Sequence, residues 1–441
     1  MSATSQISHS CTPQRGRWPR EAIEDLIRRE RFDYQRIELP HGLATDGEDR
    51  SSTADAIFPP DLTGRTVLDV GSNLGFFCFE AARRGARRVL GVDVDPENVR
   101  KARLLADCLG LDVEFRVLDV EKDPIGEDFD YVLAINLLHH LRNPLATIET
   151  LVERTRTRLA LEVAGLGRHE RRKLGLPAWR SRILGASPIV YVGRGSTSPP
   201  PPGKSRRSGF GGQRFFFSSD SLVNLLRYQR CTFARVEVEP SRHKQRYVLK
   251  ADKRRIRKLV VIAGVTASGK TTLIDRLRRG EEPEIAAAIG LSTPASAVSY
   301  DAFDLIEPRS PYVDTVLFHY DILRPFRRSA HVHARDEALD VLRTADEVTV
   351  LTILPEADEL VRRFDRAIID PKRRFGMIRG GRRKLEVREI LSDPARLSQW
   401  YETWFEYCRS RGIDSRVLLA DEGKRIENVD VWSTRSIGDA A

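Results

Sequence analysis

Cysteine is scarce in this 441-residue sequence, which contains five cysteines and two methionines. The cysteines lie far apart, at Cys11, Cys78, Cys108, Cys231 and Cys408, with no CxxC pair and no histidine at a spacing suited to zinc. Disulfide frameworks and zinc modules need closely spaced or paired cysteines, so the sequence argues against both. The pattern is typical of a protein from a reducing compartment.

Long hydrophobic runs are also absent. The apolar runs are as short as β-strands, far below the roughly 20 residues that a helix needs to span a bilayer. The segment from Met1 to Arg20 is polar and lacks the apolar stretch of a signal peptide. We therefore expect no integral membrane segment and a cytoplasmic location.

The charge balance is basic, with 73 Lys and Arg against 63 Asp and Glu and a net charge of +10. This excess favours an anionic partner such as a nucleic acid, a nucleotide, a phosphorylated sugar or an acidic membrane surface. An arginine-rich composition can equally reflect genomic base content, and two nucleotide-like cofactors would account for much of the charge. Charge alone leaves the partner open.

Strand-like and helix-like segments alternate in two stretches, as parallel sheets with crossover helices require. Strands are predicted at Thr66–Val70, Arg88–Val92, Val113–Val117, Tyr131–Ile135 and Arg158–Glu162, and again at Leu259–Ala263, Thr315–His319 and Glu347–Ile353. We expect a helical extension over residues 1–64, an α/β domain over 65–255 and a second α/β domain over 256–441. A Pro- and Gly-rich stretch at 193–212 predicts a flexible insertion.

The first α/β stretch contains an acidic residue at a strand end followed by a glycine-bearing turn. In VLDVGSNLGFF, Asp69 lies near the end of the strand, and Gly71, Asn73 and Gly75 lead into a helix. Such a turn brings backbone N–H groups and a helix N-terminus close to a cofactor. Because Asn73 replaces the second glycine of GxGxxG, the turn argues against NAD.

Two further carboxylates follow the next strands. Asp93 ends the second strand, where a carboxylate can accept both ribose hydroxyls, and Asp119 follows the third, where it suits an adenine edge. Either one taken singly equally suits a helix cap. Their order and spacing together predict a Rossmann-like domain that binds S-adenosylmethionine (SAM).

The segment Trp18 to Lys253 resembles the class I SAM-dependent methyltransferases, in particular the branch of tRNA wobble-uridine (5-oxyacetic acid pathway) methyltransferases and polysaccharide-cluster relatives. The resemblance rests on YQRIELPHG, IFPPDLTGRTVLDVGSNLGFFCFEAARRGA, FDYVLAINLLHHLRNP, FFFSSDSLVNLLR and HKQRYVL. It implies that the cofactor is lined by Asp69, Gly71, Gly75 and Asp93, with Asp119 at the adenine and Asn136 to His140 as the wall near the methyl group.

A histidine pair and a histidine–lysine pair are candidates for the chemistry. His139 and His140 follow the fourth strand at the sheet edge where ligands bind, so either suits the base that a hydroxyl acceptor needs. Either equally suits packing against, or capping of, the following helix. His243 and Lys244, in SRHKQRY, suit an acceptor phosphate or plain surface solvation.

The second α/β stretch opens with a complete Walker A motif, KLVVIAGVTASGKTTLIDRLRR, between an apolar strand and an amphipathic helix. The motif predicts a P-loop fold that binds ATP and Mg²⁺. The predicted phosphate-binding residues are Gly264, Ala267, Ser268, Gly269, Lys270, Thr271 and Thr272. Lys270 would neutralise the phosphates, and Thr271 would hold Mg²⁺.

The other candidate residues of this second site lie further along the sequence from the Walker A motif. Asp321, which ends VLFHYD, is the predicted carboxylate ligand of Mg²⁺, and Asp301, in SYDAFDL, is the predicted catalytic base. Either equally suits a helix cap. The segment from Arg362 to Lys384 is similar to the arginine-bearing lid of small-molecule kinases, or is a solvated basic helix and loop.

Two adjacent catalytic domains suggest two reactions on one acceptor. The leading hypothesis is a bifunctional enzyme that phosphorylates and methylates a glycan or other hydroxylated metabolite, with an anionic or phosphorylated acceptor, as in surface-polysaccharide biosynthesis. The alternatives are a tRNA wobble-uridine methyltransferase with an accessory NTPase domain, and a methyltransferase regulated by a nucleotide-binding P-loop switch.

Overall fold

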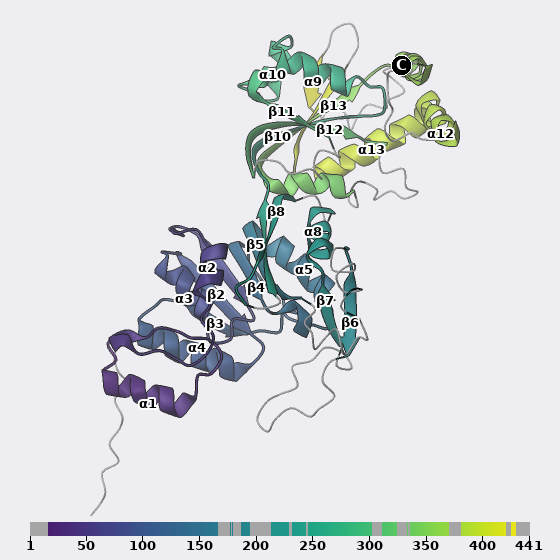
Figure 1. The fold of residues 1–441 in the computed structure, drawn as a ribbon. Helices are drawn as coiled ribbons and strands as arrows, with labels where there is room; N and C mark the ends of the chain where they lie inside the picture. The colour runs from purple at the N-terminus through teal and green to yellow at the C-terminus, as the bar shows by residue number, and fades with distance from the viewer. Residues whose placement is uncertain are drawn as a thin grey trace, which may run out of the picture. The chain divides into compact units, whose positions relative to one another are not determined.

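The structure is a computed structural model. It describes residues 16–165, 177, 179, 187–194, 213–228, 232–243, 246–301, 311–323, 333, 336–369, 381–419 and 425–428. The chain divides into two compact units, one made of residues 1–226 and 236–253 and the other of residues 227–235 and 254–441 (Figure 1).

The first unit is built on a seven-stranded sheet with the order β3-β2-β1-β4-β5-β9-β8. Its strands are β1 (Thr66–Val70), β2 (Arg88–Asp93), β3 (Glu114–Val117), β4 (Phe129–Ile135), β5 (Thr155–Ala164), β8 (Phe233–Pro240) and β9 (Arg246–Lys253). β1 pairs in parallel with β2 and β4, whereas β9 runs antiparallel to β5. The five predicted strands of this stretch are confirmed.

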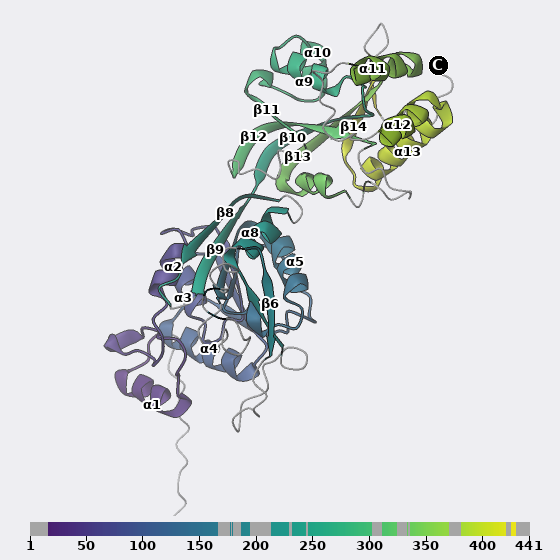
Figure 2. The same cartoon turned by 45° about the vertical axis from the view of Figure 1, so that its right-hand side comes forward.

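Helices cover both faces of this sheet. They are α1 (Arg20–Glu30), η1 (Pro40–Gly42), α2 (Ser51–Ile57), α3 (Phe76–Arg83), α4 (Pro96–Leu109), η2 (Leu138–His140), α5 (Pro144–Arg154) and α8 (Ser219–Tyr228). Figures 1 and 2 show α3 and α4 on one face and α5 on the other. The N-terminal segment packs into the same hydrophobic cluster as β1, through residues that include Ile23, Leu26 and Ile57. It is therefore part of the core of the first unit.

Local sequence explains why these helices begin and end where they do. The Asp95 side chain accepts a hydrogen bond from the N–H of Glu97, and Pro96 occupies the first helical position of α4. The helix ends at Gly110, whose φ of 68° lies in the left-handed region that favours glycine. The helix that leads away from the end of β2 is thus fixed by its own caps.

A separate two-stranded sheet pairs β6 (Val190–Arg194) with β7 (Gln213–Phe217) in antiparallel fashion. Gly193 and Arg194, expected in the insertion at 193–212, are instead the last two residues of β6. They join the ladder because each pairs with a residue at the start of β7. The rest of that insertion lies outside the described residues.

The second unit contains a six-stranded sheet with the order β11-β12-β10-β13-β14-β15. Its strands are β10 (Arg255–Gly264), β11 (Val298–Tyr300), β12 (Tyr312–Asp321), β13 (Ala345–Leu354), β14 (Asp414–Leu419) and β15 (Ile426–Asn428). All neighbours are parallel except β14 and β15. The three strands predicted here are confirmed, and β10 is flanked by the other two.

Alternate residues of β10 face two different helical layers. The helical elements of this unit are α9 (Lys270–Arg278), α10 (Pro283–Ala288), η4 (Pro294–Ser296), η6 (Glu337–Thr344), α11 (Ala357–Ile369), α12 (Gly381–Ser392) and α13 (Pro394–Ser410). Val260 and Ile262 share a buried cluster with α9 and α10, whereas Leu259, Val261 and Ala263 share one with α11, α12 and α13. β10 is therefore covered on both sides, as its near-continuous apolar sequence requires.

Candidate functional site

The turn after β1 is shaped by three residues in the left-handed region, where φ is 79° at Gly71, 52° at Asn73 and 90° at Gly75. A Cβ atom at Gly75 would lie 2.5 Å from Cζ of Phe115, and one at Gly71 would lie 3.1 Å from Cδ1 of Leu137. Only glycine fits the first of these positions without displacing an aromatic ring. The turn is held close to the residues that follow β4.

Asp93 ties this turn to the end of β2. Its Oδ2 accepts a hydrogen bond from the N–H of Asn73 at 3.0 Å, and its Oδ1 accepts from the N–H of Asp95 at 2.9 Å and from Nδ2 of Asn98 at 3.2 Å. A carboxylate offers about four acceptor positions, so three donors leave room for one more. Asp93 is thus oriented by the protein and suited to one ribose hydroxyl, with the second reached if Asn98 moves.

Asp69 lies beneath the same turn and is 1% exposed. Burial raises its pKa to about 7, the Cys78 thiol 3.6 Å away lowers it, and the nearby Asp93 raises it further. At neutral pH a large share of Asp69 is therefore protonated. Its place under the turn indicates a role in shaping the loop.

Two buried polar atoms beside the turn have no hydrogen-bond partner among the described residues: Oγ of Ser72 and Oδ1 of Asn136. Asn136 follows β4 with a φ of 56°, and its Nδ2 donates to Oε2 of Glu162 at 2.6 Å. Leaving a buried acceptor unpaired costs about 1–3 kcal/mol. The residues present therefore fit SAM, whose ammonium group and ribose hydroxyls would supply donors.

The structure does not bring the Asp119 carboxylate into this network. Oδ1 of Asp119 accepts from the N–H of Glu121 at 3.1 Å, and Oδ2 pairs with Nζ of Lys122 at 2.8 Å. The hydrogen bond from Lys122 holds the pKa of Asp119 below its usual value. Its side chain folds onto its own turn, so its predicted adenine contact stays a prediction.

His139 and His140 form η2 just after β4, and their ring centroids lie 4.0 Å apart. His139 is half-buried, and His140 is exposed. Both stand at the carboxyl end of the sheet, as expected from the sequence. Their predicted catalytic role stays a prediction.

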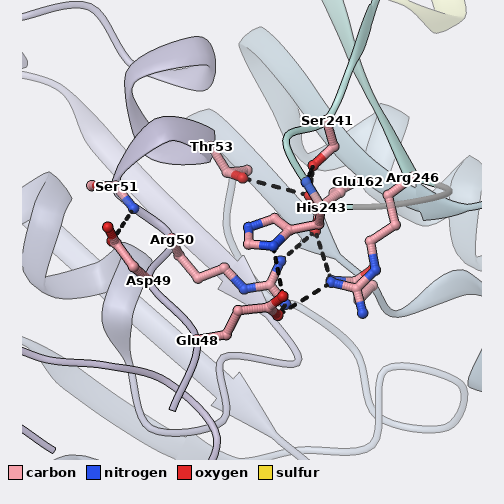
Figure 3. Close-up of polar contacts among 10 residues, drawn as sticks. Glu48, Asp49, Arg50, Ser51, Thr53, Glu162, Ser241, His243 and Arg246 are labelled. Carbon is pink, nitrogen blue, oxygen red and sulfur yellow. Dashed lines mark hydrogen bonds and ion pairs between the residues drawn. The ribbon is translucent and has the colours of Figure 1, made fainter. Parts of the chain in front are cut away.

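A cluster of charged side chains lies at this end of the sheet (Figure 3). The sequence reasoning named only its His243, and Lys244 lies outside the described residues. Arg50, just before α2, donates to Oε2 of Glu162 on β5 at 3.0 Å, and both side chains are fully buried. Glu48 pairs with Arg50 at 2.9 Å and with Nδ1 of His243 at 2.7 Å. The available sequence signal was Glu162, a carboxylate in the middle of the apolar strand RLALEVA.

In the second unit the predicted phosphate-binding loop connects β10 to α9. φ is 155° at Gly264, 67° at Ala267 and 96° at Gly269. Nζ of Lys270 is buried and donates to the carbonyl oxygens of Gly264 at 2.9 Å and Val265 at 2.6 Å. Burial lowers the pKa of Lys270, and the ring of carbonyls keeps its ammonium group inside the loop.

Asp321 meets this loop from β12, where it is the register partner of Gly264. Its Oδ2 accepts from Oγ1 of Thr266 at 2.8 Å and lies 3.5 Å from Nζ of Lys270. The pair of Lys270 and Asp321 is therefore brought together as predicted. Thr271 and Thr272 are exposed on the first turn of α9, and Oγ of Ser268 is buried without a hydrogen-bond partner among the described residues.

His319 on β12 was missed by the sequence reasoning. Burial and then the positive charge of Lys270 lower its pKa to about 4, while Asp321 and Asp301 raise it. Asp301 therefore lies near enough to act electrostatically on this group. Arg363, at the beginning of the predicted lid, has Nη1 3.7 Å from where a Cβ of Gly269 would lie; residues 370–380 of that lid lie outside the described residues.

Three further findings concern metal binding, membrane spans and surface pockets. Among the described residues, no group of three or more His, Cys, Asp or Glu side chains is placed to hold a metal ion by itself. None of the helices in that part of the chain combines the length and apolarity that crossing a bilayer requires. A surface pocket lies at the amino ends of β1 and β2, away from the predicted residues, and is lined by Arg87, Arg88, Glu127, Asp128 and Arg154, among others.

Comparison with known proteins finds relatives of the first unit. A family model described as a methyltransferase domain matches residues 62–164. A tRNA U34 carboxymethyltransferase from Cellvibrio japonicus (strain Ueda107) is 32% identical over 111 residues, which is 24% of this chain and 34% of that protein. A ubiquinone biosynthesis O-methyltransferase from Methylobacterium sp. (strain 4-46) is 33% identical over 106 residues, which is 24% of this chain and 42% of that protein.

The chain thus spans about a third to two fifths of the length of these curated relatives. Among solved structures, the N-terminal domain of EvdMO1 with SAH bound is 20% identical and gives a TM-score of 0.41, over 54% of this chain and 98% of that one. The family match covers β1 to β5, the segment that carries the turn, Asp93 and Asn136. Residues 62–164 therefore match the family described as a methyltransferase domain.

Proposed function

We propose that the chain is a bifunctional enzyme, a SAM-dependent methyltransferase in its first unit and an ATP-dependent phosphotransferase in its second. The observation that carries the first half is Asp93, which three donors hold in place beside two buried polar atoms that have no hydrogen-bond partner among the described residues. The residues that would hold SAM are Asp69, Gly71, Asn73, Gly75, Asp93 and Asn136.

The second half rests on the loop around Lys270. An ammonium group enclosed by backbone carbonyls and 3.5 Å from a strand-end carboxylate is suited to charged phosphate oxygens. Bound Mg²⁺ would neutralise charge on the phosphates, held by Thr271 and Asp321. Mg²⁺ is normally bound by one or two carboxylates and by substrate phosphates, and Asp321 would be the carboxylate.

The acceptor in this proposal is a glycan or another hydroxylated metabolite, and both reactions act on it. Phosphorylation followed by methylation is the proposed order, as would serve surface-polysaccharide biosynthesis. One relative is named a ubiquinone biosynthesis O-methyltransferase. This name supports oxygen as the methylated atom.

A tRNA substrate is the second candidate. The relatives named tRNA U34 carboxymethyltransferase and the net charge of +10 favour it. A chain that binds tRNA should show an affinity for tRNA that falls steeply as the salt concentration rises, because phosphates that the protein neutralises release their counterions.

The test incubates the full chain with methyl-labelled SAM and γ-labelled ATP, together with a panel of monosaccharides, nucleotide sugars or bulk tRNA. The proposal expects label from both donors in a sugar-containing product. Methylation of tRNA alone would favour the second candidate. Failure to bind SAM by calorimetry would overturn the methyltransferase half, and ATP hydrolysis without a phosphorylated product would overturn the phosphotransferase half.

A further inference from the structure

His243 and Glu48 form a closely paired dyad at the carboxyl end of the first sheet (Figure 3). Nδ1 of His243 lies 2.7 Å from Oε1 of Glu48. Burial raises the pKa of Glu48. The positive charge of Arg50, the hydrogen bond from His243 and the positive charge of Arg246 outweigh burial and hold that pKa below its usual value. An ionised carboxylate only accepts hydrogen bonds, so the proton of a neutral His243 ring sits on Nδ1.

The other ring nitrogen is then left with a lone pair. Nε2 of His243 is buried and has no hydrogen-bond partner among the described residues. The backbone N–H of His243 also donates to Oγ of Ser241 at 3.1 Å, which fixes the residue in its loop. A ring oriented from two sides with an unpaired Nε2 is arranged to receive a proton donor, because an unpaired buried acceptor is costly.

Glu162 connects this dyad to the cofactor side of the sheet. Its carboxylate accepts from Oγ of Ser241 at 2.7 Å, from Nη1 of Arg50 at 3.0 Å and from Nδ2 of Asn136 at 2.6 Å. Asn136 precedes Leu137, the residue that lies against Gly71 in the cofactor turn. A continuous set of contacts therefore runs from that turn to His243, and both stand at the edge where ligands of α/β sheets bind.

The charges of the cluster indicate what kind of acceptor it takes. The two carboxylates of Glu48 and Glu162 are balanced by the two guanidinium groups of Arg50 and Arg246, the latter 3.6 Å and 3.9 Å from them. Nη1 of Arg246 is buried and has no hydrogen-bond partner among the described residues, so it suits a phosphate carried elsewhere on the acceptor. A phosphate or carboxylate oxygen itself needs no base to attack a sulfonium methyl group. A neutral hydroxyl does need one.

We propose that His243 is the general base of methyl transfer to a neutral hydroxyl group, with Glu48 as the residue that positions it. In that step the acceptor oxygen forms a bond to the methyl carbon of SAM while the carbon–sulfur bond breaks. The hydroxyl proton moves to Nε2 of His243, and S-adenosylhomocysteine (SAH) leaves. The inference rests on the methyltransferase half of the proposed function and names its base and acceptor class.

The first test needs no acceptor. Nitrogen NMR of the full chain, labelled at histidine and saturated with SAH, is assigned by comparison with the His243→Asn variant. The proposal expects that the neutral His243 ring carries its proton on Nδ1 and not on Nε2, and that in a Glu48→Gln variant this tautomer is no longer the single form. A proton on Nε2, or a ring that stays doubly protonated up to pH 8, would overturn it.

The second test measures SAH formation with D-glucose and uridine as hydroxyl probes and with inorganic phosphate as the anionic probe. His243→Asn should lower the rate with a hydroxyl probe at least about 100-fold and should abolish the rising limb of the pH–rate profile. SAM affinity should change less than about threefold. His41→Asn is the matched control, because His41 is bonded to the carbonyl of Trp18 in the same unit, and it should leave the rate unchanged.

The outcomes separate the inference from the function on which it rests. Loss of SAM binding in the wild-type chain would count against the methyltransferase itself. SAM binding with transfer to phosphate but to no hydroxyl probe, or an unchanged rate in His243→Asn, would overturn the base assignment alone; if no probe is methylated, the NMR result decides. The charged groups that face His243 and enter the pH profile are Glu48, Asp49, Arg50, Glu162 and Arg246.

Discussion

Nη1 of Arg50 lies 3.0 Å from Oε2 of Glu162, and the two side chains are 2% and 0% exposed. The pair joins the N-terminal extension to the middle of the sheet, across 112 residues of sequence. Two buried charges repay their desolvation only when they are well paired and hydrogen-bonded. The extension is therefore bound into the first unit by electrostatics as well as by its apolar side chains.

Glu162→Ala should destabilise the first unit by about 3 kcal/mol, because it leaves Nη1 of the buried Arg50 without its carboxylate and only Glu48 still pairs with the guanidinium group. Urea unfolding of the full chain, with the transition of the first unit identified by its shift on adding SAH, measures this change. Glu80→Ala, which breaks the partly exposed pair of Glu80 and Arg83, should cost no more than about 1 kcal/mol. An equal effect of both variants would contradict the buried-pair argument.

Asp93→Asn should weaken SAM binding about 10- to 100-fold, because the ribose loses a charge-assisted hydrogen bond worth roughly 1.5–3 kcal/mol. ATP affinity should not change. The control is Asp95→Asn, two residues away, since asparagine caps a helix as well as aspartate does. Calorimetric titration with SAM distinguishes the two variants, and equal SAM affinities in them would remove Asp93 from the cofactor site.

The sequence predicted those parts of the fold that depend on neighbouring residues. The strands followed from apolar runs of strand length, and Asp93 and Lys270 from motifs in which strand, turn and helix are consecutive. The Glu48, Glu162 and His243 cluster has no such local signal, because its members lie on three segments far apart in the chain. Asp119 shows that a local motif does not settle a side chain's contacts. Its carboxylate pairs with Lys122, three residues later in the chain, and this pairing competes with the predicted adenine contact.

Asp69 should make the stability of the first unit fall as pH rises. Its pKa is about 7 in the folded chain, against 3.8 as its ordinary value, so the folded state binds more protons than the unfolded state between about pH 4 and 7. Stability is then lost by up to about 1.4 kcal/mol per pH unit in that window. Asp69→Asn should flatten this dependence in urea melts at pH 5, 6 and 8, and parallel curves for variant and wild type would contradict it.

Lys270→Ala should abolish phosphotransfer and weaken ATP binding at least about tenfold, because the ammonium group held inside the loop is removed. SAM affinity should be unchanged. Arg278→Ala, at an exposed position of the same helix, is the matched control and should bind ATP normally. If methylation needs the phosphorylated acceptor, Lys270→Ala should also fail to methylate the unphosphorylated one, whereas persistent methylation would show that the two reactions are independent.

His319 should make ATP binding take up a proton at mildly acidic pH. Burial and the charge of Lys270 hold its pKa at about 4 in the free protein, so the ring is neutral between about pH 4 and its ordinary value of 6.5. In EDTA, where no Mg²⁺ neutralises Asp321, a bound triphosphate offsets the charge of Lys270 and raises that pKa, so the affinity for metal-free ATP should increase as pH falls through this window. Calorimetry at pH 5.5 in two buffers of different ionisation enthalpy measures the uptake, with SAM binding as the control ligand. His319→Asn should lose the uptake while still binding ATP at pH 8; a buffer-independent heat in the wild-type chain would remove His319 from the phosphate site.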